Sequence, residues 1–245
     1  MRPDPQPPKR PLSLGRLIGG LFLPLVVLAF GAAALLYHPD TPLPDPWNPT
    51  TPLDPMAEVT PLTHWKLSKA VSDPMLCWAA LSASGTIYST REDQNNSDSC
   101  HIRTPTRITR IDATRLNPVE TRCEIALRWA MWDRHGVQTA ARKHLGSSVT
   151  RVHHFGSYSC RKIAGSNRMS QHATANAIDI SGFDLADGTK IRLRNDWDGP
   201  ADKAAFLRDV RNSACSWFGL VLSPDYNAAH HDHFHMDQGR WGRCR

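Results

Sequence analysis

The sequence predicts an α+β fold in which helices flank a small antiparallel sheet. Two observations support this class: short strand-like segments are mixed along the chain, and the segments with helical periodicity are set apart from them. A third observation is that six cysteines are dispersed through the same region, which predicts stabilisation by disulfides. The N-terminal part differs in composition and requires a separate interpretation.

The chain begins with a basic tail over residues 1–16, followed at residues 17–37 by about 21 uncharged, mainly apolar residues. That length is enough to cross a bilayer as a helix, and Pro24 is tolerable inside a membrane helix. Basic residues ahead of the segment predict a cytoplasmic N-terminus and an exported remainder. A cleaved signal peptide is the alternative. We favour an uncleaved anchor because the segment is longer than a signal core and no small-x-small site directly follows it.

Residues 38–63 carry a proline every few positions, which predicts an extended, semi-rigid linker. The folded domain is expected over residues 64–245. Together with the anchor, this organisation predicts a single-pass inner-membrane protein whose C-terminal domain lies in the periplasm.

Within the domain, periodicity predicts three helices and four strands. Pro118 suits the first turn of the first helix. The expected helices cover residues 118–134, 137–145 and 201–213, and the expected strands cover residues 148–155, 176–180, 190–193 and 218–222.

No two of the six cysteines form a Cys-x-x-Cys pair, which argues against a zinc knuckle or a thioredoxin-type site. An even, dispersed set in an exported protein predicts a disulfide framework. Six cysteines allow about fifteen pairings. Among these, a bond from Cys215 to Cys244 would tie the chain end to the last helix.

The formal net charge of +6 owes much to the N-terminal tail. The remaining domain is only mildly basic, and it has no stripe of Lys and Arg interleaved with aromatic residues. Nucleic acid is therefore excluded as an expected partner.

Two polar clusters carry the candidate chemistry: Ser170–Asp179 (SQHATANAID), and His230–Asp237 (HHDHFHMD), which holds four of the twelve histidines. In a strand, His233 and His235 point to the same face. Asp179 lies among apolar neighbours, and a buried carboxylate needs a compensating partner such as a metal ion.

Two histidines and one aspartate, with water in the open fourth position, make a catalytic type of zinc site. Such a zinc ion lowers the pKa of its water to about 7 and polarises a carbonyl. The alternatives are a solvated His-rich loop that binds metal adventitiously and, for His172, an ordinary surface or capping residue.

The arrangement Ser-x-His-(x)6-Asp followed downstream by His-x-His resembles the zinc peptidases that group lysostaphin, D-Ala-D-Ala peptidases and the hedgehog signalling domain. The resemblance implies that His172, Asp179 and His235 bind zinc. It implies a catalytic role for His233 from one branch and a base at Asp232 from the other, and we prefer His233. His230 also matches the family pattern.

A longer resemblance covers residues from about Cys77 to Arg245. The stretches CEIALRWAMW, GSYSCRKIAGSNRMSQHATANAIDISGF and FGLVLSPDYNAAHHDHFHMD resemble the bacterial extensin-like C-terminal domain family. This resemblance implies a cell-envelope protein related to the zinc peptidases. In those relatives a residue ahead of the metal motif binds a substrate carboxylate or the oxyanion, which makes Arg161 and Arg168 candidates for substrate binding. Ser170 is a further candidate, either for a ligand or substrate contact or as a turn cap.

The function expected from these features is an exported, membrane-anchored, zinc-dependent hydrolase of peptidase or amidase type that acts on peptidoglycan peptides. His233 or Asp232 would act as the base, and His230 or Arg161 would stabilise the oxyanion. The alternatives are a zinc-containing binding module of the cell envelope without turnover, and a disulfide-built structural spacer.

Overall fold

The computed structural model describes residues 14–38, 43–239 and 242–245. Contacts along the chain divide it into two compact units, Met1–Thr51 and Pro52–Arg245. Leu53 is buried in the core of the second unit. This unit therefore starts ahead of residue 64, where the folded domain was expected to begin.

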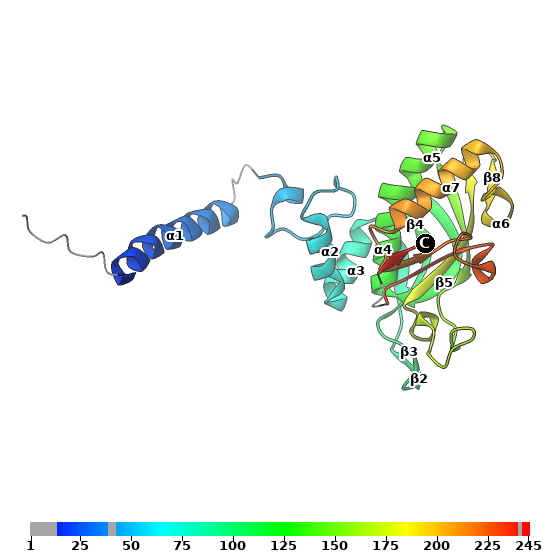
Figure 1. The fold of residues 1–245 in the computed structure, drawn as a ribbon, viewed down its shortest axis with the longest axis horizontal. Helices are drawn as coiled ribbons and strands as arrows, with labels where there is room; N and C mark the ends of the chain where they lie inside the picture. Colours follow the sequence, from blue (N-terminus) through cyan, green and yellow to red (C-terminus); the bar gives the residue numbers. More distant parts are fainter. Residues whose placement is uncertain (1–13, 39–42, 240–241) are drawn as a thin grey trace, which may run out of the picture. The chain divides into compact units, whose positions relative to one another are not determined.

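In the first unit, the apolar segment forms helix α1 Leu14–Tyr37, with Pro24 inside it (Figure 1). A 3-10 turn, η1 Asp45–Trp47, follows. Among the residues that the structure describes, no helix is long and apolar enough to cross a membrane. The anchor expected at residues 17–37 stays a prediction, and most of the expected basic tail lies outside the described residues.

The second unit has the α+β class that the sequence predicts, and it is built on one nine-stranded sheet. Strand order is β1-β4-β5-β6-β7-β10-β9-β11, and β8 also pairs with β7. A separate hairpin pairs β2 with β3. The strands are β1 Ile87–Thr90, β2 Gln94–Ser97, β3 Cys100–Ile102, β4 Pro105–Ile111, β5 Thr114–Arg122, β6 Val149–Gly156, β7 Ala177–Leu185, β8 Lys190–Arg192, β9 Leu220–Leu222, β10 Phe234–Asp237 and β11 Arg243–Cys244.

The expectation of a small antiparallel sheet is wrong in both size and pairing. The sheet is mixed, because β5 runs parallel to β6 and β9 runs parallel to β11. It is large because the segment before residue 118 supplies β1, β4 and the first part of β5. These strands were not expected from the sequence, although exposed arginines such as Arg107 and Arg115 stand beside buried Ile108 and Leu116, an alternation that is typical of a half-buried strand.

The helix expected over residues 118–134 is also partly wrong. Strand β5 continues to Arg122, and helix α4 starts only at Cys123. Pro118 is compatible with the strand because it lies where the register between β4 and β5 shifts, so no ladder hydrogen bond is required of it. The other six expected helices and strands are confirmed, with β7 longer than predicted.

Helices α4, α5 and α7 cover one face of the sheet (Figure 1). Phe183 of β7 makes edge contacts with Trp132 of α4 and Phe206 of α7, at ring-centroid distances of 6.3 and 5.3 Å. The helices are α2 Thr63–Val71, α3 Pro74–Ala83, α4 Cys123–Trp132, α5 Gln138–Leu145, α6 Leu193–Asp196 and α7 Ala201–Ala214, with the short turns η3 Gln171–Thr174 and η4 Ala228–His230.

A π-helical turn, η2 Asp133–Val137, joins α4 to α5 and passes close to α7. A Cβ atom added at Gly136 would lie only 2.8 Å from the Cβ of Ser213, and closer still to its hydroxyl oxygen. Glycine is therefore required at this crossing, since any larger residue pushes the two helices apart.

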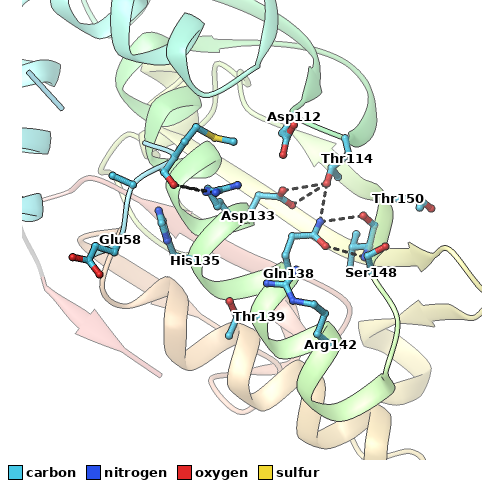
Figure 2. A pocket seen from close by; sticks show the side chains of 15 residues that line it. Glu58, Asp112, Thr114, Asp133, His135, Gln138, Thr139, Arg142, Ser148 and Thr150 are labelled. Atoms are coloured by element: carbon cyan, nitrogen blue, oxygen red, sulfur yellow. Dashed lines mark hydrogen bonds between the residues drawn. The ribbon is translucent and has the colours of Figure 1, made fainter. Parts of the chain in front are cut away.

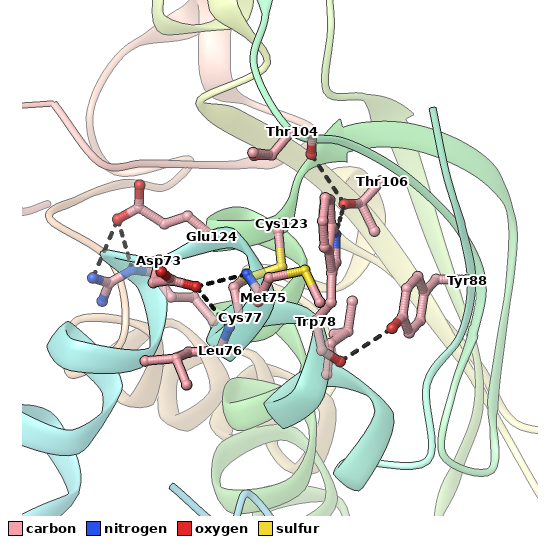
Figure 3. Close-up of a disulfide and its surroundings, with 12 residues drawn as sticks. Asp73, Met75, Leu76, Cys77, Trp78, Tyr88, Thr104, Thr106, Cys123 and Glu124 are labelled. Atoms are coloured by element: carbon pink, nitrogen blue, oxygen red, sulfur yellow. Dashed lines mark hydrogen bonds and ion pairs between the residues drawn. A yellow bond between two sulfur atoms is a disulfide. The ribbon is translucent and has the colours of Figure 1, made fainter. Parts of the chain in front are cut away.

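The disulfide framework expected from the cysteines is present, with all six paired. Cys77 of α3 bonds to Cys123 at the start of α4, beside the hydrogen bond from the Trp78 indole to Thr106 (Figure 3). Cys100 of β3 bonds to Cys160, which ties the β2–β3 hairpin to the segment leading into η3. The third bond joins Cys215 to Cys244, so among the possible pairings the one that ties the chain end to the last helix is present.

Candidate metal centre

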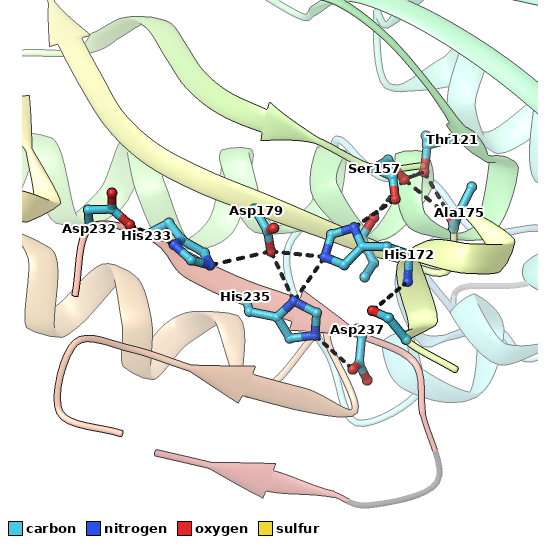
Figure 4. Close-up of polar contacts among 11 residues, drawn as sticks. Thr121, Ser157, His172, Ala175, Asp179, Asp232, His233, His235 and Asp237 are labelled. Atoms are coloured by element: carbon cyan, nitrogen blue, oxygen red, sulfur yellow. Dashed lines mark hydrogen bonds and ion pairs between the residues drawn. The ribbon is translucent and has the colours of Figure 1, made fainter. Parts of the chain in front are cut away.

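Asp179 and His235 stand directly opposite each other on the neighbouring strands β7 and β10. Ile178, Ile180, Phe234 and Met236 point into the helix-covered core. Because side chains alternate along a strand, Asp179 and His235 must point to the opposite face. There His235 Nδ1 lies 2.9 Å from Asp179 Oδ1 (Figure 4).

His172 reaches the same point from the short 3-10 helix η3. Ser170 caps this helix, and its hydroxyl accepts a hydrogen bond from the His172 backbone N–H. His172 Nε2 lies 3.1 Å from both Asp179 Oδ1 and His235 Nδ1. His172 is only 3% exposed and Asp179 only 8%, so the three donor atoms meet in a nearly dry site.

The outward nitrogens of both histidines are held by hydrogen bonds. His172 Nδ1–H donates to the Ser157 carbonyl at 2.8 Å. His235 Nε2–H donates to the buried carboxylate of Asp237 at 3.0 Å. Metal-binding histidines are usually oriented in this way by a carbonyl or a carboxylate. The inward nitrogens, His172 Nε2 and His235 Nδ1, are thereby aimed at Asp179.

The electrostatics of the cluster favour a positive charge at its centre. Burial opposes ionisation of Asp179, but the adjacent His172 and His235 outweigh it and hold the pKa of this carboxyl well below its usual range. Burial also disfavours protonated His235, yet hydrogen bonds to Asp179 and Asp237 raise its pKa to about 9. The site thus holds a proton where a metal cation would compete for it.

The donor set fits a zinc ion. Two imidazole nitrogens and one carboxylate oxygen are the ligand types of catalytic zinc sites. Tetrahedral ligands about 2.0–2.1 Å from zinc lie roughly 3.3 Å from one another. The donor atoms of His172, Asp179 and His235 are 2.9–3.1 Å apart. They therefore need to separate by only a few tenths of an ångström. Among the described residues, this trio alone forms a metal-compatible group.

His233 stands next to the trio on the same face. Its Nδ1–H donates to Asp232 Oδ1 at 2.9 Å, and its Nε2 lies 3.8 Å from Asp179 Oδ1. Asp232 therefore orients the His233 ring, and the ring, not the aspartate, faces the cluster (Figure 4). The two residues that sequence patterns left as alternative bases therefore differ in their contacts: His233 faces Asp179, and Asp232 contacts His233.

His230 lies farther out, with its ring centroid 5.2 Å from that of His233. Burial and the neighbouring His233 and His235 lower the pKa of His230 to about 4. Asn227 Oδ1 already accepts from the Ala229 backbone N–H, so it also accepts from His230 Nδ1–H. Neutral His230 then carries a lone pair on Nε2, which suits a proton acceptor better than an oxyanion donor.

The three residues expected to bind substrate lie in different environments. Arg161 is exposed and lies within electrostatic range of His230. Arg168 is exposed in the turn that the Lys162–Met169 bridge closes. Ser170 is buried, and its hydroxyl serves the cap of η3, so its observed role is to position His172.

Sequence reasoning missed two groups at this site. Asp237 holds His235, and the spacing of His233, His235 and Asp237 at every second position was a usable signal for it. The other group is the backbone carbonyl of Ser157, which holds His172. A backbone carbonyl leaves no trace in residue identity, so no sequence signal existed.

A separate pocket of about 650 Å³ lies beside η2 and is lined mostly by polar residues, including Asp133, Gln138 and Arg142 (Figure 2). Asp133 is buried and accepts hydrogen bonds from the Thr114 hydroxyl at 3.1 and 3.3 Å. Burial, opposed by the hydrogen bonds from Thr114 and Gln138, raises the pKa of Asp133 to about 7.

Comparison with known proteins gave one match. A family model described as the extensin-like protein C-terminus covers residues 75–245, a range that includes His172, Asp179 and His235. Searches of curated proteins and of solved structures found no match.

Proposed function

Since the chain belongs to the extensin-like protein C-terminus family, we propose that this family's domain acts here as a zinc-dependent hydrolase of peptidase or amidase type. Its substrate is an amide bond in a peptidoglycan peptide. The observation that carries the proposal is the convergence of His172, Asp179 and His235, whose donor atoms all lie within 4.8 Å of one another.

A zinc ion bound there supplies Lewis-acid polarisation of a carbonyl and a lowered pKa for water. His172, Asp179 and His235 hold it, with Ser157 and Asp237 fixing the two imidazoles. This leaves the acid–base chemistry to residues beside the cluster.

His233 is the proposed general base. Its Nε2 faces the cluster while Asp232 holds Nδ1–H, so the ring can accept a proton from water and later pass it to the leaving amine. The negative charge of Asp232 stabilises the imidazolium that forms in between. Arg161 is the better candidate for the oxyanion, because its guanidinium is always a donor.

The proposed location rests on two features. Three disulfides are typical of an oxidising compartment, and the apolar segment at residues 17–37 follows a basic tail. We propose an inner-membrane anchor with the domain in the periplasm, where peptidoglycan is the accessible polymer.

One observation favours a second candidate, a zinc-containing binding module of the cell envelope without turnover. His172 and Asp179 are almost fully buried, as in sites where a metal has a structural role. In that case the metal would hold η3 against the sheet, and His233 would contribute no chemistry.

Two alanine variants and a control variant distinguish the candidates. For each, both the zinc content and the release of soluble muropeptides from purified sacculi are measured. Wild-type protein should bind one zinc per chain and release product. His235→Ala should lose both zinc and product release. His233→Ala should keep zinc and lose product release by about 10²–10⁴-fold.

His231→Ala is the matched control, because His231 belongs to the same histidine cluster but its side chain is 54% exposed. It should retain zinc and activity. Zinc-loaded wild-type protein that binds sacculi yet releases no product would establish the binding module instead. Full activity after complete zinc removal would contradict both candidates.

A further inference from the structure

Beside the metal cluster, four rings form a continuous row, here called the aromatic row: Phe155, His233, His230 and Tyr226. Successive ring centroids are 5.6, 5.2 and 5.5 Å apart. The two histidines in the middle are half-buried, whereas Phe155 is 61% exposed and Tyr226 is 42% exposed. The row thus ends in apolar surface on each side of the proposed base.

Phe155 occupies a backbone position that aims it at this site. In the pairing of β6 with β7, His154 faces Ile180 and Gly156 faces Asp179, so Phe155 is the extra residue of a β-bulge. Gly156 has a φ of +112°, which permits the bulge. Bulges next to active sites commonly redirect a side chain.

His154 and Phe155 point to opposite faces of the sheet, as neighbouring strand residues do. The ring of His154 packs against Trp129 of the core, with 5.9 Å between the ring centroids. The next residue, Phe155, contacts His233 on the opposite face. Phe155 therefore adds little to the core, since it is mostly exposed, yet it lies directly beside a metal ligand in the ladder. Folding alone does not account for an apolar ring at this position.

We propose that Phe155 forms the wall of a substrate subsite that takes an uncharged, apolar side chain adjacent to the scissile amide. This inference rests on the proposed metal centre and deepens the proposed function. A peptide that presents its carbonyl to the metal cluster within reach of His233 lays the neighbouring side chain across the exposed face of Phe155. An alkyl group gains by leaving water there, whereas a polar group loses hydration without finding a partner.

The test uses binding, so it does not depend on turnover. N-acetyl-leucine hydroxamate and N-acetyl-asparagine hydroxamate are nearly isosteric, equally uncharged probes that carry the same metal-chelating group. Their dissociation constants would be measured by titration calorimetry on the zinc-loaded full chain. The leucine compound should bind about fivefold more tightly, as expected for partial burial of its alkyl carbons.

Phe155→Ala should bring the ratio of the two dissociation constants to about one, and Phe155→Leu should keep most of it. Trp65→Ala is the matched control, because Trp65 is an aromatic ring that is 48% exposed on helix α2. It should leave the ratio unchanged. The ratio reports side-chain recognition, which a general loosening of the fold would not shift selectively.

The proposal is overturned if wild-type protein binds both probes equally or not at all, or if Phe155→Ala keeps the wild-type ratio. It is also overturned if chitotriose binds and Phe155→Ala abolishes that binding, because Phe155 would then be a sugar platform. A preserved ratio without product release from sacculi would refute the hydrolase and leave the subsite standing. Product release from sacculi together with equal binding of the two probes would refute the subsite and leave the hydrolase standing.

Discussion

Asp133 should make the protein less stable as the pH rises through neutrality. Its carboxyl is buried at the start of η2, and burial raises its pKa to about 7 from an unfolded value of 3.8. Between these two values the unfolded chain is ionised at this position while the folded chain keeps the proton. The folded state therefore binds more protons, and the free energy of unfolding falls with increasing pH.

The magnitude follows from the size of the shift. A difference of one pKa unit corresponds to about 1.36 kcal/mol, so the full effect approaches about 4 kcal/mol once the pH exceeds 7. Most of the change accessible to experiment lies between pH 5 and pH 8, where Asp133 should cost the fold about 2–3 kcal/mol. Asp133→Asn keeps the size of the side chain and an oxygen that accepts from Thr114, but it cannot ionise.

The assay is urea unfolding of wild-type protein and Asp133→Asn at pH 5 and pH 8, with chelator present so that the metal site contributes equally. The stability of the variant relative to wild type should increase by about 2–3 kcal/mol between the two pH values. Asp98→Asn, an exposed carboxylate of the β2–β3 hairpin, is the control and should show no such change. A relative stability of Asp133→Asn that is independent of pH would refute the reasoning.

Two further predictions concern the metal centre and the helix crossing. Asp237→Asn should weaken zinc binding by about 10–100-fold, measured by competition with a chelating dye, because His235 loses the carboxylate that orients it; an unchanged affinity would contradict that role. Gly136→Ala should lower the free energy of unfolding by about 1–3 kcal/mol in urea, because the new methyl group meets Ser213. Adding Ser213→Gly should recover part of this loss, and no recovery would place the strain elsewhere.

Sequence patterns were most informative where the signal is local. Period-two alternation predicted that His233 and His235 share one face. His235 lies in β10 between the core residues Phe234 and Met236, and His233 directly precedes this strand with its ring beside the same cluster. Sequence patterns were least informative at Pro118, where an apparent helix start proved to be an irregular point in strand β5. The apolar positions after Cys123 are helical, and the periodicity was extended too far toward the N-terminus.

Residue types and local spacing predicted two His- and Asp-rich segments, a disulfide framework built from six cysteines and an α+β fold, and the family resemblance joined His172, Asp179 and His235 into one site. Only the tertiary structure decided the pairing of β7 with β10, which sets Asp179 opposite His235, and the hydrogen bond by which Asp232 holds the His233 ring toward the cluster. The tertiary structure also brings the backbone carbonyl of Ser157 to His172 as its hydrogen-bond acceptor. The reason is that alternation along a strand is a property of neighbouring residues, whereas register between segments far apart in sequence is chosen by how the whole core packs.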